Sequence, residues 1–113
     1  MEFRLTYGCS HVYLVLISTI VSMLDGVEQN LTLPAPIDED IYEWDEAELV
    51  KLGVKSLPQT LGEALATLSA DSTLAKALGD DFVAEYLATK TPEWIDYCRS
   101  VSDWEYQRYL TWP

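Results

Sequence analysis

The chain of 113 residues has few of the side chains on which most catalytic sites depend. It contains one histidine, His11, so neither a histidine-rich metal site nor a Ser-His-Asp triad is expected. Its two cysteines, Cys9 and Cys98, lie far apart and form no CxxC pair. This spacing argues against a disulfide framework and against a cysteine zinc site, and it favours a reduced, cytoplasmic protein.

Positive charge is also scarce. Seven lysines and arginines stand against nineteen aspartates and glutamates, which gives a formal net charge of -12. Because phosphate contacts need a basic patch, nucleic acid is not an expected partner. The acids gather over residues 38–48 and at Asp80 and Asp81, where a solvated surface is the simplest explanation. Hydrophobic residues make up 49% of the chain, enough for one small domain with a modest core.

The apolar run from Val12 to Leu24 allows two interpretations. As a signal-peptide core it would make the chain a small secreted acidic protein, with the sequon that begins at Asn30 as a glycan site. However, Glu2 stands where a signal peptide is normally positive, and the run is shorter than the about 20 residues of a membrane span. We therefore expect no membrane partner and a helix that is buried on most sides and closed by Gly26.

So short a chain can hardly cover a helix that is apolar all round. This imbalance points to missing partner structure, either more polypeptide or other subunits. It also predicts exposed apolar surface over residues 12–24 when the chain is alone.

The remainder divides into a connector and a helical half. Pro34 and Pro36 forbid a helix, so residues 27–56 are expected to be extended, with one helical turn over residues 45–52. Capping residues, and apolar residues spaced three and four apart, predict four helices, which begin at Thr60, Asp71, Asp80 and Ser102. Glu63 and Glu105 are expected to complete capping boxes with Thr60 and Ser102. Gly79 is expected to close the second of these helices, and Thr91-Pro92 either kinks the third or ends it.

Glu2 and Arg4 lie two residues apart in a weakly alternating stretch before Gly8. On a strand both side chains would point to the same face. A carboxylate beside a guanidinium can serve a metal and an anionic substrate, or it can be an ordinary surface salt bridge. Spacing alone does not decide between them.

Several motifs follow one another in order along the whole chain. They are Glu2-Phe3-Arg4, Tyr7-Gly8-Cys9-Ser10, His11-Val12-Tyr13-Leu14, Leu24-Asp25-Gly26, the prolines 34 and 36, Ile41-Tyr42-Glu43, Leu57 to Leu65, and a tail with Phe82-Val83-x-x-Tyr86, Glu93-Trp94 and Asp103-Trp104-Glu105. This order resembles the C-terminal part of the glutamine synthetase family, and the tail is most similar to the branch with gamma-glutamyl-polyamine synthetases. The chain departs from the family's Asn-Pro at His11-Val12, which we interpret as an incidental replacement.

The resemblance implies a mainly α chain. It would be a C-terminal helical fragment of the family's α+β catalytic domain, with at most one short N-terminal strand. Residues 1–7 would end the active-site strand, 12–26 would form a buried helix, 27–56 a connector, and 57–113 the C-terminal helices.

The resemblance also implies chemistry. Glu2 matches a glutamate that ligates a divalent cation, Mg²⁺ or Mn²⁺, and Arg4 matches an arginine that meets the substrate and the transferring phosphoryl group. The implied enzyme uses ATP to activate a glutamate carboxylate as an acyl phosphate, which ammonia or an amine then attacks, and it forms a homo-oligomeric ring. The family's other metal ligands and nucleotide segments precede the position of Glu2, so this chain is expected to be inactive and without cofactor alone. The alternative is a non-catalytic acidic helical module that docks on a full-length relative.

Overall fold

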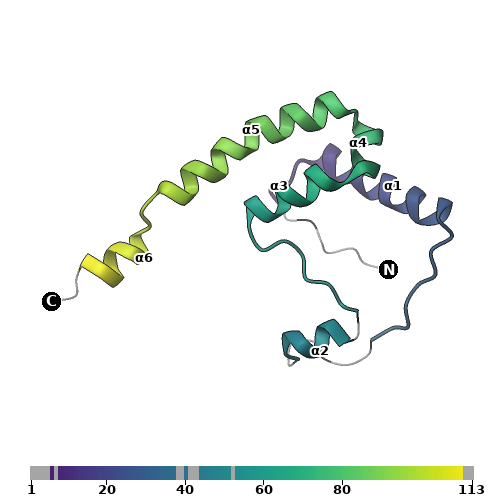
Figure 1. The fold of residues 1–113 in the computed structure, drawn as a ribbon, viewed down its shortest axis with the longest axis horizontal. Coiled ribbons are helices and arrows are strands. Elements are labelled where there is room, and N and C mark those ends of the chain that lie inside the picture. The colour runs from purple at the N-terminus through teal and green to yellow at the C-terminus, as the bar shows by residue number, and fades with distance from the viewer. Residues whose placement is uncertain (1–5, 7, 38–39, 41–43, 52, 111–113) are drawn as a thin grey trace.

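The computed structural model describes residues 6, 8–37, 40, 44–51 and 53–110. Its helices are α1 (Val12–Glu28), α2 (Glu46–Lys51), α3 (Leu61–Ala70), α4 (Ser72–Leu78), α5 (Asp80–Arg99) and α6 (Asp103–Glu105), which continues into a π-helical turn, η2 (Tyr106–Leu110) (Figure 1). The mainly α fold class is confirmed, and no strand occurs among the residues just given. The strand expected over residues 1–7 falls on positions that are not described, apart from Thr6 and its bend.

Helix α1 is capped by His11 at its start and ends beyond Gly26, the glycine that was expected to close it. The His11 Nδ1 atom accepts a hydrogen bond from the Leu14 backbone N–H at 3.4 Å. The helix continues through Gly26, and the left-handed residue at its end is Asn30, with φ of 51°. The N–H groups of Asn30 and Leu31 donate to the carbonyls of Val27 and Gly26. This is a Schellman closure, in which asparagine tolerates the positive φ better than most residues.

Helix α2 forms at the expected turn in the connector. The Asp45 carboxylate accepts from the Glu48 N–H at 2.8 Å, and the Glu48 carboxylate accepts from the Asp45 N–H at 3.1 Å. Gly53, with φ of 71°, follows the helix, and its N–H donates to the Val50 carbonyl. A reciprocal capping box and a glycine closure therefore hold this short helix.

The predicted caps of α3 and α4 are present. Thr60 Oγ1 accepts from the Glu63 N–H at 3.1 Å, although the Glu63 carboxylate accepts from the N–H of Gln59 instead of that of Thr60. Asp71 Oδ1 accepts from the first backbone N–H groups of α4. Gly79, with φ of 91°, closes α4 and lets α5 begin at once.

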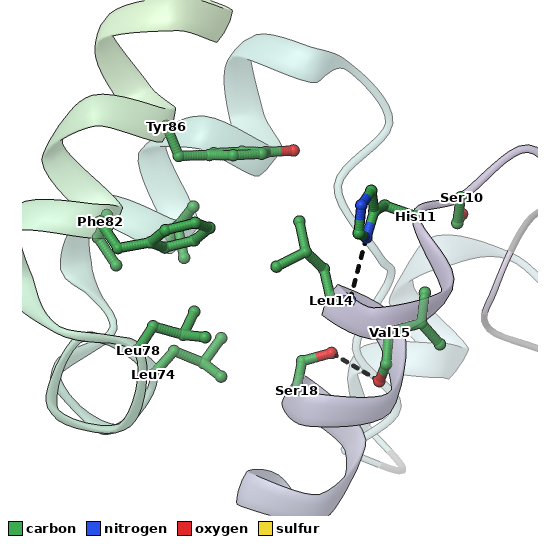
Figure 2. A pocket seen from close by; sticks show the side chains of 11 residues that line it. Ser10, His11, Leu14, Val15, Ser18, Leu74, Leu78, Phe82 and Tyr86 are labelled. Carbon is green, nitrogen blue, oxygen red and sulfur yellow. Dashed lines mark hydrogen bonds between the residues drawn. The ribbon is translucent and has the colours of Figure 1, made fainter.

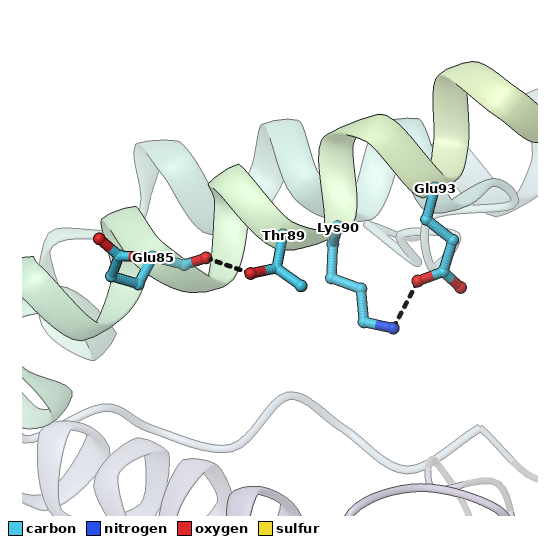
Figure 3. Close-up of polar contacts among 4 residues, drawn as sticks. All are labelled: Glu85, Thr89, Lys90 and Glu93. Carbon is cyan, nitrogen blue, oxygen red and sulfur yellow. Dashed lines mark hydrogen bonds and ion pairs between the residues drawn. The ribbon is translucent and has the colours of Figure 1, made fainter.

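Helix α5 runs through Pro92 as one element of 20 residues, so the proline does not end it. Side chains on the turns around the proline make local bonds (Figure 3). The Thr89 hydroxyl donates to the Glu85 carbonyl at 2.8 Å, and the Lys90 ammonium pairs with the Glu93 carboxylate at 2.6 Å. The carboxylate raises the pKa of Lys90, first through the hydrogen bond and then through its charge. Because this pair lies at the surface, water screens it and its contribution to stability is small.

The helices pack as a chain of neighbours and not as a closed bundle. Helix α3 lies along α5, α4 contacts both α5 and α1, and α6 with η2 stands away from this group at the end of α5 (Figure 1). Among the described residues, the buried hydrophobic side chains are Leu65 and Val83, which are 8% and 6% exposed. The core therefore sits where α3 packs against the first turns of α5.

The chain exposes far more surface than a compact domain of its size. Its accessible surface is 10287 Å², whereas a folded monomer of 12.8 kDa is expected to expose about 6,300 Å². Its radius of gyration is 18.4 Å, against about 13 Å for a compact domain. Large apolar side chains of α1 are exposed, with Val12 and Tyr13 at 73% each. The exposed apolar surface expected over residues 12–24 is confirmed.

The cap of α6 supplies a pH-dependent test of the local structure. The Glu105 carboxylate accepts from the N–H and the hydroxyl of Ser102 at 2.7 and 2.9 Å, and these bonds, the backbone one foremost, lower the pKa of Glu105. A lowered pKa in the folded state means that the stabilisation is present above the ordinary glutamate pKa and is lost as the pH falls through the lowered value. We expect carboxyl NMR titration to place Glu105 below an ordinary glutamate, and the α6 amide shifts to change in the same acidic step. Glu105→Gln should abolish that step; an ordinary or raised pKa would contradict the capping box.

Candidate functional site

The two residues that carry the predicted chemistry, Glu2 and Arg4, lie outside the described residues. What the structure describes is the turn that follows them and the first turns of α1. The roles assigned to these two side chains therefore stay predictions.

A pocket of about 350 Å³ opens directly after that turn, between the start of α1 and the α4–α5 corner (Figure 2). Its lining consists of Ser10, His11, Leu14, Val15, Ser18, Leu68, Leu74, Leu78, Phe82, Val83 and Tyr86. Figure 2 shows the apolar side chains of the two sides facing each other across it, while the Tyr86 hydroxyl is directed toward the side where His11 lies. The pocket is an apolar groove with a polar rim.

Two of the polar groups on the rim, those of His11 and Ser18, make hydrogen bonds within α1. Because His11 Nδ1 accepts from the backbone of α1, the ring proton of the neutral imidazole belongs on Nε2. The Ser18 hydroxyl donates to the Val15 carbonyl at 3.0 Å. No carboxylate or lysine lines the groove. It has the chemistry of a packing surface, and it offers no acid–base pair for catalysis.

His11 has a structural function that the sequence did not predict. We expected an incidental replacement, and the structure places the imidazole as the N-cap of α1. Its position directly before an apolar helix was the available signal, although histidine is not among the usual capping residues.

The described residues do not fit a divalent cation by themselves. Within that part of the chain, no three His, Cys, Asp or Glu side chains gather closely enough to hold a metal ion. Mg²⁺ asks for six oxygen ligands, and Glu2 could supply only one side chain. Cys9 and Cys98 are both exposed free thiols. The family resemblance implies that the other ligands of a metal at Glu2 come from other polypeptide, and this stays a prediction.

A second cavity, of about 410 Å³, lies where the start of α3 meets the second half of α5. Its walls are formed by Gln59, Thr60, Leu61, Glu93, Trp94 and Tyr97. The rings of Trp94 and Tyr97 stack with centroids 5.7 Å apart. Sequence periodicity placed both aromatics on one stripe of α5, but it gave no sign that Trp94 lies against the backbone of α3.

No helix in the described ranges has the length and apolar character needed to cross a membrane.

Comparisons with known proteins cover nearly all of the chain. The family model described as glutamine synthetase, catalytic domain, matches residues 1–109. The chain is 41% identical over 110 residues to a glutamate–methylamine ligase of Methyloversatilis universalis, 36% identical to a glutamine synthetase of Methanocaldococcus jannaschii, and 37% identical to one of Clostridium saccharobutylicum. Each alignment covers 97% of this chain. The chain spans about a quarter of the length of these relatives, 24% to 25%.

Proposed function

The chain belongs to the glutamine synthetase family, and from that premise we propose that it supplies part of an ATP-dependent ligase. In the intact enzyme, a glutamate carboxylate is activated as an acyl phosphate, and ammonia or an amine displaces the phosphate. The 113-residue chain is inactive alone. The observation that carries the proposal is the alignment of 97% of this chain with a quarter of a glutamate–methylamine ligase.

Within this proposal, Glu2 and Arg4 contribute the chemistry of the chain. Glu2 would be one ligand of Mg²⁺ or Mn²⁺, and Arg4 would contact the substrate and the transferring phosphoryl group. Positioning and charge neutralisation are the main requirements of phosphoryl transfer, and a guanidinium meets a phosphoryl group with two parallel hydrogen bonds. The remaining metal ligands, the nucleotide segments and the acceptor segments would come from other polypeptide. The choice between ammonia and an amine therefore lies outside this chain.

The proposed setting is a homo-oligomeric ring in the cytoplasm. The large exposed surface of the chain suits an assembly in which other polypeptide covers it. The exposed thiols of Cys9 and Cys98 suit a reducing compartment.

A chimera tests the proposal. Residues 1–110 of this chain replace the matching quarter of the Methyloversatilis universalis ligase, and phosphate release is measured with glutamate, ATP, Mg²⁺ and either ammonia or methylamine. We expect turnover by the chimera and none by the 113-residue chain. Glu2→Ala and Arg4→Ala in the chimera should each lower kcat by roughly a hundredfold or more, since each removes charge stabilisation of the phosphoryl transfer.

Glu85→Ala is the matched control, because Glu85 is an exposed carboxylate on α5 away from both cavities. It should change kcat less than about twofold, as surface substitutions usually do. A chimera that assembles but shows no turnover would count against the ligase function. Full activity after Glu2→Ala would show that Glu2 is not a metal ligand and would leave the ligase function standing. Turnover by the isolated 113-residue chain would contradict the expectation that it is inactive alone.

The exposed apolar side chains of α1 also favour a second candidate function, a non-catalytic module that docks on a full-length relative. In that case the chain should bind an intact glutamine synthetase and change its activity or assembly without contributing to turnover. Sedimentation of the chain with and without the intact relative measures this. A chain that sediments independently of the relative would exclude the module.

A further inference from the structure

Helix α5 has a weak point in its backbone at Pro92. Proline has no backbone N–H, so the helical bond that would join residue 92 to the Ala88 carbonyl cannot form, and the proline ring crowds that carbonyl. Sharp bends in helices occur mostly at such positions. The structure nevertheless has α5 as one element from Asp80 to Arg99. Contacts with neighbouring elements therefore decide how firmly the two halves of α5 are held in line.

Helix α3 lies beside α5 and contacts it on both sides of the proline. The last turns of α3 include Leu68, which lines the apolar groove together with Val83 from the first half of α5. The first turn of α3 includes Leu61, which lines the second cavity together with Trp94 from the second half of α5. Helix α3 thus connects two segments of α5 that the proline would otherwise let bend apart.

The contact with the second half of α5 depends mainly on one side chain. Trp94 is half-buried, and its indole lies so close to α3 that a Cβ atom on Gly62 would be 2.5 Å from Nε1. The other large apolar side chains after the proline in α5, Ile95 and Tyr97, are 40% and 70% exposed. In the first half of α5, by contrast, Val83 is only 6% exposed. The second half is therefore held less firmly than the first.

We propose that Pro92 is a hinge within α5, and that the packing of the Trp94 indole on Gly62, which we call the latch, keeps this hinge straight. With the latch closed, α3 fixes the direction of both halves of α5. When the indole leaves Gly62, the end of α5 changes direction about Pro92 and takes α6 and η2 with it. The inference rests on contacts within this chain, so it depends neither on the ligase function nor on what covers α1.

The ion pair between Lys90 and Glu93 also spans the proline (Figure 3). Both groups lie at the surface, where water and salt screen their attraction. A pair of this kind is too weak to fix the direction of a helix by itself. The latch is therefore the contact whose loss should free the hinge.

Residual dipolar couplings of the backbone N–H groups in the 113-residue chain test the hinge, because they report the direction of each helix segment. In the unaltered chain we expect one alignment to fit residues 80–91 and 93–99 together. In Trp94→Ala, the couplings of residues 93–99 should require an alignment rotated by more than about 20°, the size of a sharp helix kink, or should shrink as the segment samples several directions. Gly62→Ala displaces the indole without removing it and should cause the same change to a smaller extent. It provides the test if Trp94→Ala fails to fold.

Pro92→Ala in the Trp94→Ala background identifies the position of the hinge. Alanine restores the backbone donor to the Ala88 carbonyl, so we expect a single alignment to return although the latch is absent. Trp104→Ala is the matched control, because it removes an indole that is 63% exposed on α6, and it should leave the couplings of α5 unchanged.

Three results would overturn the proposal. A single alignment for both halves of α5 in Trp94→Ala and in Gly62→Ala would show that α5 has no hinge. Two alignments that persist in the double variant would show that the motion does not arise at Pro92. Two alignments already present in the unaltered chain would show that the indole does not hold the two halves in line.

Discussion

Replacing Val83 by aspartate is expected to abolish the cooperative unfolding of the α3–α4–α5 region. Val83 is 6% exposed and, with Leu65, forms the buried apolar centre of the described chain. An aspartate there must either bury a charge without a partner or take up a proton, and either event costs several kcal/mol. A small domain with so little burial has a free energy of unfolding of at most about 5 kcal/mol. The loss therefore exceeds what the fold can tolerate.

The adjacent residue supplies the control for this substitution. Ala84 is exposed on the same turn of α5, so Ala84→Asp introduces the same side chain without burying it. It should cost no more than about 0.7 kcal/mol of helix propensity. Thermal melts followed by circular dichroism at 222 nm, at one fixed protein concentration, compare the two variants. If Val83→Asp melts as Ala84→Asp does, α3 and α5 do not share the core described above.

The features that sequence predicted well are decided within three or four residues of one another. Thr60 and Asp71 cap their helices as expected, Gly79 closes α4, and Ser102 forms its box with Glu105. Each of these depends on a side chain that reaches a backbone group in the next turn, so no knowledge of the rest of the fold is needed.

Predictions were less complete where two residues could each end the same helix, or where the outcome depends on residues far apart in the sequence. Gly26 was expected to close α1, but the helix continues because Asn30 provides an alternative left-handed residue four positions later. The apolar pattern of α1 indicated burial without indicating which face α4 would cover. The candidate site depends still more on distant structure. Glu2 and Arg4 were assigned by resemblance, and it is the same resemblance that assigns the other ligands of the metal to other polypeptide.

The contact between α3 and α5 leads to a second prediction: replacing glycine by alanine should lower the free energy of unfolding at Gly62 and raise it at Gly26. A Cβ atom on Gly62 would lie 2.5 Å from Nε1 and 2.7 Å from Cε2 of the Trp94 indole. Gly62→Ala gains up to about 1 kcal/mol of helix propensity, but the displaced indole loses its packing at a cost of about 1–3 kcal/mol. We therefore expect net destabilisation. Gly26 is helical as well, and a Cβ there would meet nothing within 4 Å. Gly26→Ala should stabilise the chain by about 0.5–1 kcal/mol.

Urea denaturation of both variants, and of the same changes in a Trp94→Ala background, identifies the cause. If the indole is responsible, Gly62→Ala should become stabilising once Trp94 is removed, while Gly26→Ala should keep its effect, because distant sites add. Destabilisation by Gly62→Ala that persists without the indole would show that α3 does not approach α5 through Trp94. Helix propensity contributes equally in both backgrounds, so it cannot change the sign of the effect on stability. If the effect of Gly62→Ala changes from destabilising to stabilising when Trp94 is removed, and that of Gly26→Ala does not change, the contact between the Gly62 backbone and the Trp94 indole is what connects the two helices.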